Sequence, residues 1–369
     1  MPDAALPAAD RPQRHARRAR GPRRAWELVE ALPPEGGAGA DLVYRRRELR
    51  DRAQPLLVAR DAADVFVATS MAALARAAGP AAWAAWCRRL AASPIRRMHE
   101  DAARLRAGLA VVGLPLTGPA HAAIDRARAG YFRRQMLTAA EGAGRLDIGI
   151  DFAAADLARL RAALDRGRGT ILWVDDTFCG QLVSKRALAE ADLPPAHVSS
   201  ALHGVSLSRF GVAWLNPPVI RAENRHLGER LVFAGGETAE VMRRILRILR
   251  GGGVVTMTNS VFSGGGFVET PFGDGGWLSL ATGAPGLALR HGAALFPLAA
   301  VEVEPFRRYR IVLGAEVEGA GRDGSNAALA AVARRVAGEM RERVRAWPDQ
   351  YPGLLGGRFT ATRFPDLRA

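Results

Sequence analysis

The residues best suited to do chemistry follow a short apolar run, TILWV, at residues 170–174. Asp175 and Asp176 come directly after it, and Gln181 and Lys185 follow on a segment with helical spacing. A buried strand that runs into a loop and then a helix is where α/β proteins place ligands and reacting groups. A carboxylate there can accept a proton, and the ammonium group of Lys185 can pair with Asp176 or with a phosphate. The stretch predicts a reaction or binding site at one edge of a sheet.

A second group of polar residues follows the next predicted strand, HVSS at 197–200. His203 lies at a turn after this strand, which should end on the same edge of the sheet as Asp176. Imidazole has an ordinary pKa close to neutrality, so His203 is a candidate general base. Arginines bind phosphate through paired hydrogen bonds, although a solvated surface would have a similar composition. With Lys185, the residues that we assign to substrate binding are Ser206, Arg209, Arg221, Glu223 and Arg230.

The composition is that of a globular protein, with 369 residues, 49% hydrophobic and 24% charged. The net charge is +15, and Lys185 is the single lysine among 52 basic residues. This charge suits an anionic membrane surface or phosphorylated substrates, whereas the absence of basic motifs interleaved with aromatics argues against nucleic acid. Cys87 and Cys179 are far apart and lack metal-ligand spacing. We therefore expect a reducing compartment, no disulfide and no metal. The loop SGGGF at 263–267 lacks the strand, GxGxxG and helix order of a dinucleotide site, and the sequence has no P-loop motif, so we expect no cofactor.

The chain divides by composition into four parts. Residues 1–24 predict a disordered basic tail, and the Ala-, Arg- and Leu-rich stretch 25–145 predicts an N-terminal helical region. Strands alternate with helices over residues 146–360, which predicts an α/β domain with a mixed sheet flanked by helices, and 361–369 form a C-terminal tail. Within SRFGVAWLNPP we expect the prolines to end the segment. Since no uncharged apolar run reaches membrane length, neither a transmembrane helix nor a signal peptide is expected.

Several segments occur in an order that resembles one known family. The helix, glycine and strand of ALDRGRGTILWV come first, followed by LRILRGGGVVTMTNS. An apolar strand then enters a PFG turn, TGAP begins a helix, and a proline-containing strand follows in ALFPLAAVEV. The stretch Pro348–Tyr351 closes the pattern. Over roughly residues 110–360 the chain resembles the lipid A late acyltransferases (lauroyl and myristoyl acyltransferases) of the lysophospholipid acyltransferase superfamily.

The resemblance implies a glycerolipid acyltransferase-like fold and an enzyme that transfers a fatty acyl group. The donor would be an acyl carrier protein or coenzyme A thioester, and the acceptor a hydroxyl or amine of a lipid, glycolipid or saccharide. It also implies a cytoplasmic protein that is peripheral to the inner membrane. In the resembled family, the region that matches 203–230 lies near the acceptor phosphate or the donor pantetheine.

The chain departs from that family at the catalytic motif. The family uses a His, four residues and then an Asp or Glu, but the aligned positions here hold Asp176 and Gln181. Asp176 could itself be the base, although an ordinary aspartate pKa of about 3.9 would have to be raised by burial. Alternatively, His203 enters the same site as the base. In the third interpretation the site is inactive, and the protein binds lipid or acts as a scaffold in a biosynthetic pathway.

Overall fold

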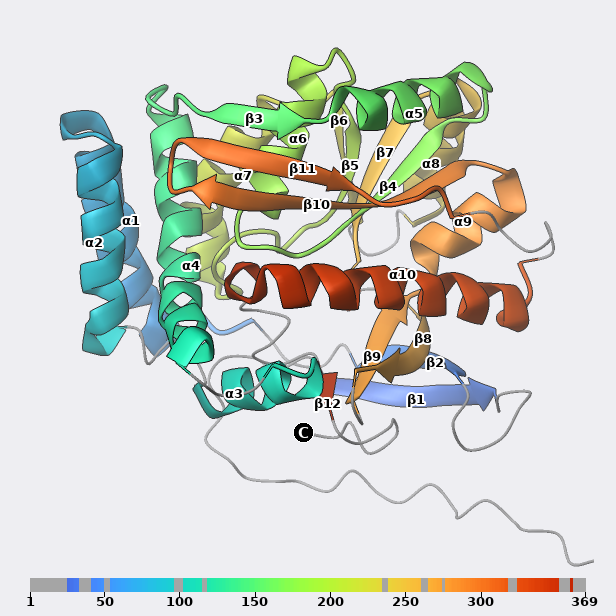
Figure 1. Ribbon diagram of the computed structural model, residues 1–369, viewed down its shortest axis with the longest axis horizontal. Coiled ribbons are helices and arrows are strands. Elements are labelled where there is room, and N and C mark those ends of the chain that lie inside the picture. The colour runs from blue at the N-terminus through green and yellow to red at the C-terminus, as the bar shows by residue number, and fades with distance from the viewer. Residues whose placement is uncertain are drawn as a thin grey trace, which may run out of the picture.

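The computed structural model describes residues 25–32, 41–49, 54–95, 102–114, 118–233, 238–259, 265–273, 276–317, 324–351 and 359–360. The two predicted tails, 1–24 and 361–369, lie outside the described residues. The described chain forms two sheets with helices around them (Figure 1).

The larger sheet has the order β3-β11-β10-β4-β7-β5-β6 in the described part of the chain. Its strands are β3 (Gly149–Phe152), β4 (Thr170–Val174), β5 (Ala196–Ser200), β6 (Glu229–Phe233), β7 (Val254–Thr258), β10 (Ala294–Glu304) and β11 (Arg308–Leu313). The β10–β11 pair is antiparallel and the other pairs are parallel. The predicted α/β fold, with a mixed sheet flanked by helices, is confirmed.

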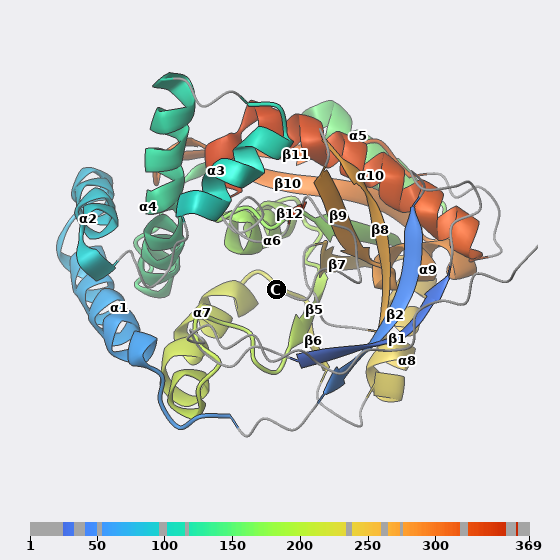
Figure 2. The ribbon, with the colours of Figure 1, turned by 90° about the horizontal axis from the view of Figure 1, so that it is seen from below.

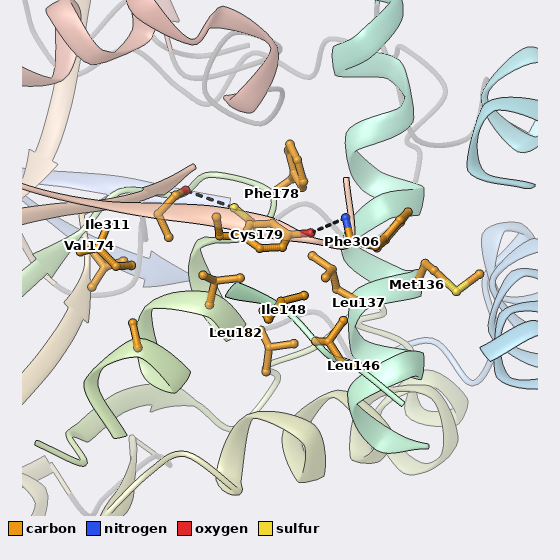
Figure 3. Close-up of a cluster of buried hydrophobic side chains, with 14 of the residues drawn as sticks. Met136, Leu137, Leu146, Ile148, Val174, Phe178, Cys179, Leu182, Phe306 and Ile311 are labelled. Carbon is orange, nitrogen blue, oxygen red and sulfur yellow. Dashed lines mark hydrogen bonds between the residues drawn. The ribbon is translucent and has the colours of Figure 1, made fainter. Parts of the chain in front are cut away.

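Strand β4 is buried on both faces, which explains its continuous apolar run. Side chains alternate along a strand, so Ile171 and Trp173 enter one core while Leu172 and Val174 enter the other. The first core is covered by α8 (Thr238–Arg250), α9 (Gly283–His291) and α10 (Asn326–Ala346). The second is covered by α4 (Gly118–Gly142), α5 (Ala154–Asp165) and α6 (Gly180–Glu190), and Figure 3 shows part of it. Each large apolar side chain buried in this way contributes about 1.5–3 kcal/mol.

The region 25–145 contains strands as well as the expected helices. The helices are α1 (Ala59–Ala77), α2 (Pro80–Ala92), α3 (Ala102–Val111) and α4, and both α1 and α2 pack on α4. However, β1 (Ala25–Leu32) and β2 (Leu42–Leu49) are strands of the smaller sheet, which we did not predict. These strands were missed because their pairing partners are distant in the sequence. Tyr44 of β2 pairs with Phe267 of β8, and the centroids of the two rings lie 5.4 Å apart.

The smaller sheet is antiparallel, with the order β1-β2-β8-β9-β12. Its other strands are β8 (Gly266–Phe272), β9 (Gly276–Ala281) and β12 (Phe359–Thr360). Helix α10 lies between the two sheets and packs against β8 (Figure 1). Among the described residues, none of the helices combines the length and the apolar character needed to cross a bilayer.

The segment 208–224 corrects one prediction. Pro217 and Pro218 do not end a segment but lie in the first turn of α7 (Asn216–Asn224). Proline is tolerated there because the first amide groups of a helix have no partner inside the helix. The π-helical turn η2 (Gly211–Leu215) leads directly into α7. The prolines therefore mark the start of a helix that delivers Glu223 to the site.

Candidate functional site

The parallel strands β4, β7 and β5 end at one edge of the larger sheet, as expected from the sequence. Four residues meet beside β5 and β6, and we call them the Glu223 cluster: Lys185, His203, Glu223 and Arg230. Lys185 comes from α6, His203 from the loop after β5, Glu223 from the last turn of α7 and Arg230 from β6. The sequence singled out all four residues, and the structure brings them together.

Glu223 is the centre of the cluster and is buried. Its Oε2 atom lies 2.6 Å from Nζ of Lys185 and 2.8 Å from Nη2 of Arg230. The Nε2 atom of His203 lies 3.0 Å from both carboxylate oxygens. Hydrogen bonds to an ionised group are about twice as strong as neutral ones, so the carboxylate fixes all three partners.

The pKa values of the cluster reflect burial and the charges within it. Burial lowers the pKa of Lys185 to about 8, against the opposing effect of Glu223. Burial also opposes ionisation of Glu223, but Lys185, His203 and Arg230 hold its pKa well below the ordinary value. Glu223 is therefore a carboxylate at neutral pH, and it can stabilise a positive charge on the neighbouring imidazole.

The imidazole of His203 is oriented for proton transfer. A neutral ring that bonds a carboxylate through Nε2 must carry its proton on that atom. The lone pair of Nδ1 is then available, because no described residue hydrogen-bonds to it. The side chain is 16% exposed, so the ring is not closed off from solvent. A histidine held by a carboxylate in this way can act as a general base.

The loop after His203 is built around the side chain of Asn216. Its Oδ1 atom accepts hydrogen bonds from the backbone amides of Val205 and Ser206, at 2.8 and 3.0 Å. Gly204 has a φ of +141°, and a Cβ there would lie 2.2 Å from Cγ of Asn216, so only glycine fits. The hydroxyl of Ser206 donates to Asp61 at 2.6 Å. Ser206, assigned to substrate binding from the sequence, therefore uses its hydroxyl to attach the loop to α1.

The other predicted site residues lie outside the Glu223 cluster. Arg209 and Arg221 are exposed and form no side-chain ion pair or hydrogen bond with another described residue. Asp176 is partly exposed, two residues beyond the end of β4. The roles assigned to these three residues stay predictions.

Asp175 is fully buried and serves as an anchor. It accepts hydrogen bonds from Nε of Arg343 at 2.7 Å and from the hydroxyl of Tyr351 at 2.8 Å. Asn259, directly after β7, donates to the same carboxylate. Asp175 thus ties the loop after β4 to α10 and to the segment that follows it. With all these bonds made inside the protein, Asp175 is suited to structure and not to proton transfer.

Gln181 occupies the position of the acid in the resembled motif and links α6 to β7. Its Nε2 atom donates to Oγ1 of Thr258 at 2.8 Å, and its Oε1 atom accepts from Nζ of Lys185 at 3.3 Å. The amide therefore helps to place the ammonium group against Glu223.

Two residues of β5 that we did not single out also line the cluster. His197 hydrogen-bonds Thr256 through Nδ1 at 3.0 Å, and its ring lies 6.3 Å from that of His203. Burial lowers the pKa of His197 well below the ordinary value, so the ring is neutral. Ser199 accepts a hydrogen bond from Arg230 at 3.0 Å. Their spacing of two residues on a predicted strand was the available signal, because it places both on one face.

Comparison with known proteins assigns no family. No protein-family model matches the chain, and no curated protein matches its sequence. In the stretches that the structure describes, His, Cys, Asp and Glu side chains do not gather into a set that could hold a metal ion.

Proposed function

We propose that this protein is an acyltransferase that moves a fatty acyl group from an acyl carrier protein or coenzyme A thioester to a lipid or saccharide acceptor. The acceptor group would be a hydroxyl or an amine, and the reaction would take place at a membrane surface. The observation that carries the proposal is the imidazole of His203, in the loop that follows β5, held by the buried carboxylate of Glu223. The order of the sequence segments supports the same reaction.

In the proposed reaction His203 acts as the base. Its Nδ1 atom takes the proton of the acceptor hydroxyl or amine while the oxygen or nitrogen bonds to the thioester carbonyl carbon. The carbon–sulfur bond then breaks, and the leaving thiolate takes the proton back from Nδ1. Glu223 stabilises the transient imidazolium without leaving its place. Positioned acid–base catalysis of this kind contributes about 10²–10⁴-fold in rate.

The basic residues divide into two roles in this proposal. Lys185 and Arg230 are held by Glu223, so they balance its charge and orient it. Arg209 and Arg221 are exposed and would bind the phosphate of the acceptor or of the donor pantetheine.

A second candidate is an inactive member of the same fold that binds lipid or acts as a scaffold. The observation that favours it is the replacement of the histidine and acid of the resembled motif by Asp176 and Gln181. In a variant of the first proposal, Asp176 and not His203 is the base. Experiment can separate this variant and the inactive candidate from the first proposal.

Single-turnover acyl transfer tests the proposal. Purified protein is mixed with labelled acyl carrier protein thioester or acyl-CoA and a lipid extract from the host, and the variants compared are His203→Gln and Asp176→Asn. We expect His203→Gln to lower the rate at least about 100-fold. His226→Gln is the matched control, since His226 is also 16% exposed and bonds a glutamate, Glu141, through Nε2 at 3.1 Å.

The outcomes separate the candidates. Loss of product in Asp176→Asn with full activity in His203→Gln would identify Asp176 as the base. Equal loss in His203→Gln and His226→Gln would refute a specific role for His203. Wild type that makes no product from any donor, yet retains bound acyl lipid, would support the lipid-binding candidate.

A further inference from the structure

Four large apolar side chains are exposed on two adjacent segments, 54–58 and 207–214, next to the loop that carries His203. Trp214 is 71% exposed, Leu56 66%, Leu57 58% and Leu207 37%, and we call these residues the Trp214 patch. Tryptophan is highly buried on average in globular proteins, so this exposure needs an explanation. Contiguous exposed apolar side chains commonly mark a surface that binds a partner or a membrane.

The residues of the patch come from two segments that are distant in the sequence but lie side by side in the structure. The backbone amides of Arg209 and Phe210 donate to the carbonyls of Pro55 and Leu56, at 2.9 and 3.0 Å. The side chain of Gln54 donates to the carbonyl of Leu207 at 2.8 Å. Figure 2 shows the start of α1 beside the helix that contains η2 and α7. These contacts hold the two leucine-bearing segments and Trp214 together.

The charged side chains within the two segments that carry the patch are all basic. Residues 54–60 and 201–222 contain no aspartate or glutamate. Arg209 and Arg221 are exposed there, and neither forms a side-chain ion pair with another residue that the structure describes. A surface of protruding apolar groups with unpaired arginines beside them complements an anionic lipid headgroup layer, where tryptophan is also enriched.

We infer that the Trp214 patch docks this protein on an anionic phospholipid bilayer. Trp214 and the three leucines enter the interface, and Arg209 and Arg221 contact lipid phosphates. Leu207 and His203 are four residues apart, so their backbones are separated by at most about 14 Å. Docking through this patch therefore places the candidate base close to the membrane surface. The docking itself does not depend on acyl transfer, because lipid binding is measured without a donor.

Vesicle sedimentation of the full chain tests the inference. The probes are phosphatidylcholine vesicles with and without phosphatidylglycerol, and we expect the wild type to bind those with the anionic lipid. Leu57→Ser combined with Trp214→Ser should weaken this binding about tenfold or more, and Arg209→Gln about fivefold. Two controls outside the patch should bind like the wild type: Val303→Ser, at a residue 39% exposed on β10, and Arg310→Gln on β11.

A second measurement locates the contact directly. Vesicles that contain brominated lipid quench a tryptophan that enters the bilayer, so quenching should be largely lost in Trp214→Phe. This substitution keeps an aromatic ring, and an unchanged urea unfolding midpoint shows that the fold is retained.

Several results would overturn the inference. They are failure of the wild type to sediment with anionic vesicles, equal binding by wild type and patch variants, and quenching that survives Trp214→Phe. If instead the patch variants dissociate a dimer, or lose binding to acyl carrier protein while vesicle binding is unchanged, the patch is a protein interface and not a membrane one.

Discussion

The buried ammonium group of Lys185 should make the stability of the protein depend on alkaline pH, and Lys185→Met should remove this dependence. Burial lowers the pKa of Lys185 from 10.5 to about 8 in the folded protein. Below about pH 8 the folded and the unfolded chain both hold the proton on Lys185, so the cost of burying the charge lowers the free energy of unfolding in full. Between about pH 8 and 10.5 the unfolded chain holds a proton that the folded chain has released, so the free energy of unfolding rises with pH.

The size of the effect follows from the two pKa values. One pKa unit is worth about 1.4 kcal/mol, so the gap between 10.5 and about 8 corresponds to about 3 kcal/mol. Methionine has a similar unbranched shape without a charge, and Glu223 keeps His203 and Arg230 as partners in the variant. The difference in free energy of unfolding, wild type minus Lys185→Met, should therefore increase by about 3 kcal/mol across this pH range.

Urea unfolding followed by far-UV circular dichroism, repeated at steps of pH, measures this difference. Titration of tyrosines and cysteines affects both proteins and cancels in the comparison. Arg186→Met, on the same helix, is the control and should keep the rise with pH, because this variant retains Lys185. Parallel curves for wild type and Lys185→Met above pH 8 would show that burial does not lower the pKa of Lys185, and the reasoning on the charge balance of the cluster would fail.

Three further predictions concern other parts of the fold. Asp175→Asn removes the nearest counter-charge of the buried guanidinium of Arg343, which keeps only Glu339 at 3.5 Å, so the free energy of unfolding in urea should fall by about 3–5 kcal/mol. An unchanged value would contradict the structural role assigned to Asp175. Gly204→Ala should lower the free energy of unfolding by about 1–3 kcal/mol, because φ is +141° and the added Cβ would lie 2.2 Å from Cγ of Asn216. A midpoint of thermal unfolding equal to that of the wild type would refute this. Burial raises the pKa of the Cys87 and Cys179 thiols to about 12, so a thiol reagent should label both in urea and neither in the folded protein.

Local patterns in the sequence were sufficient for most elements of the α/β domain. The apolar run TILWV predicted a buried strand, and the amphipathic TAEVMRRILRILR predicted a helix; the structure has β4 and α8 there. Such segments are specified by their own periodicity. The prolines at 217 and 218 were misread because proline is common both just after a helix and in its first turn, and the residues on its C-terminal side decide between the two.

Within the candidate site, the sequence by itself determined which residue types lie at the ends of β4 and β5, and hence that chemistry could gather at that edge. It singled out Lys185, His203, Glu223 and Arg230 one by one. Only the tertiary structure decided that the buried carboxylate of Glu223 pairs with the other three side chains. It also decided that Asp175 forms an ion pair with Arg343 and that β2 pairs with β8. The physical reason is that strand pairing and the balance of buried charge depend on partners far apart in the chain, which local propensity does not encode.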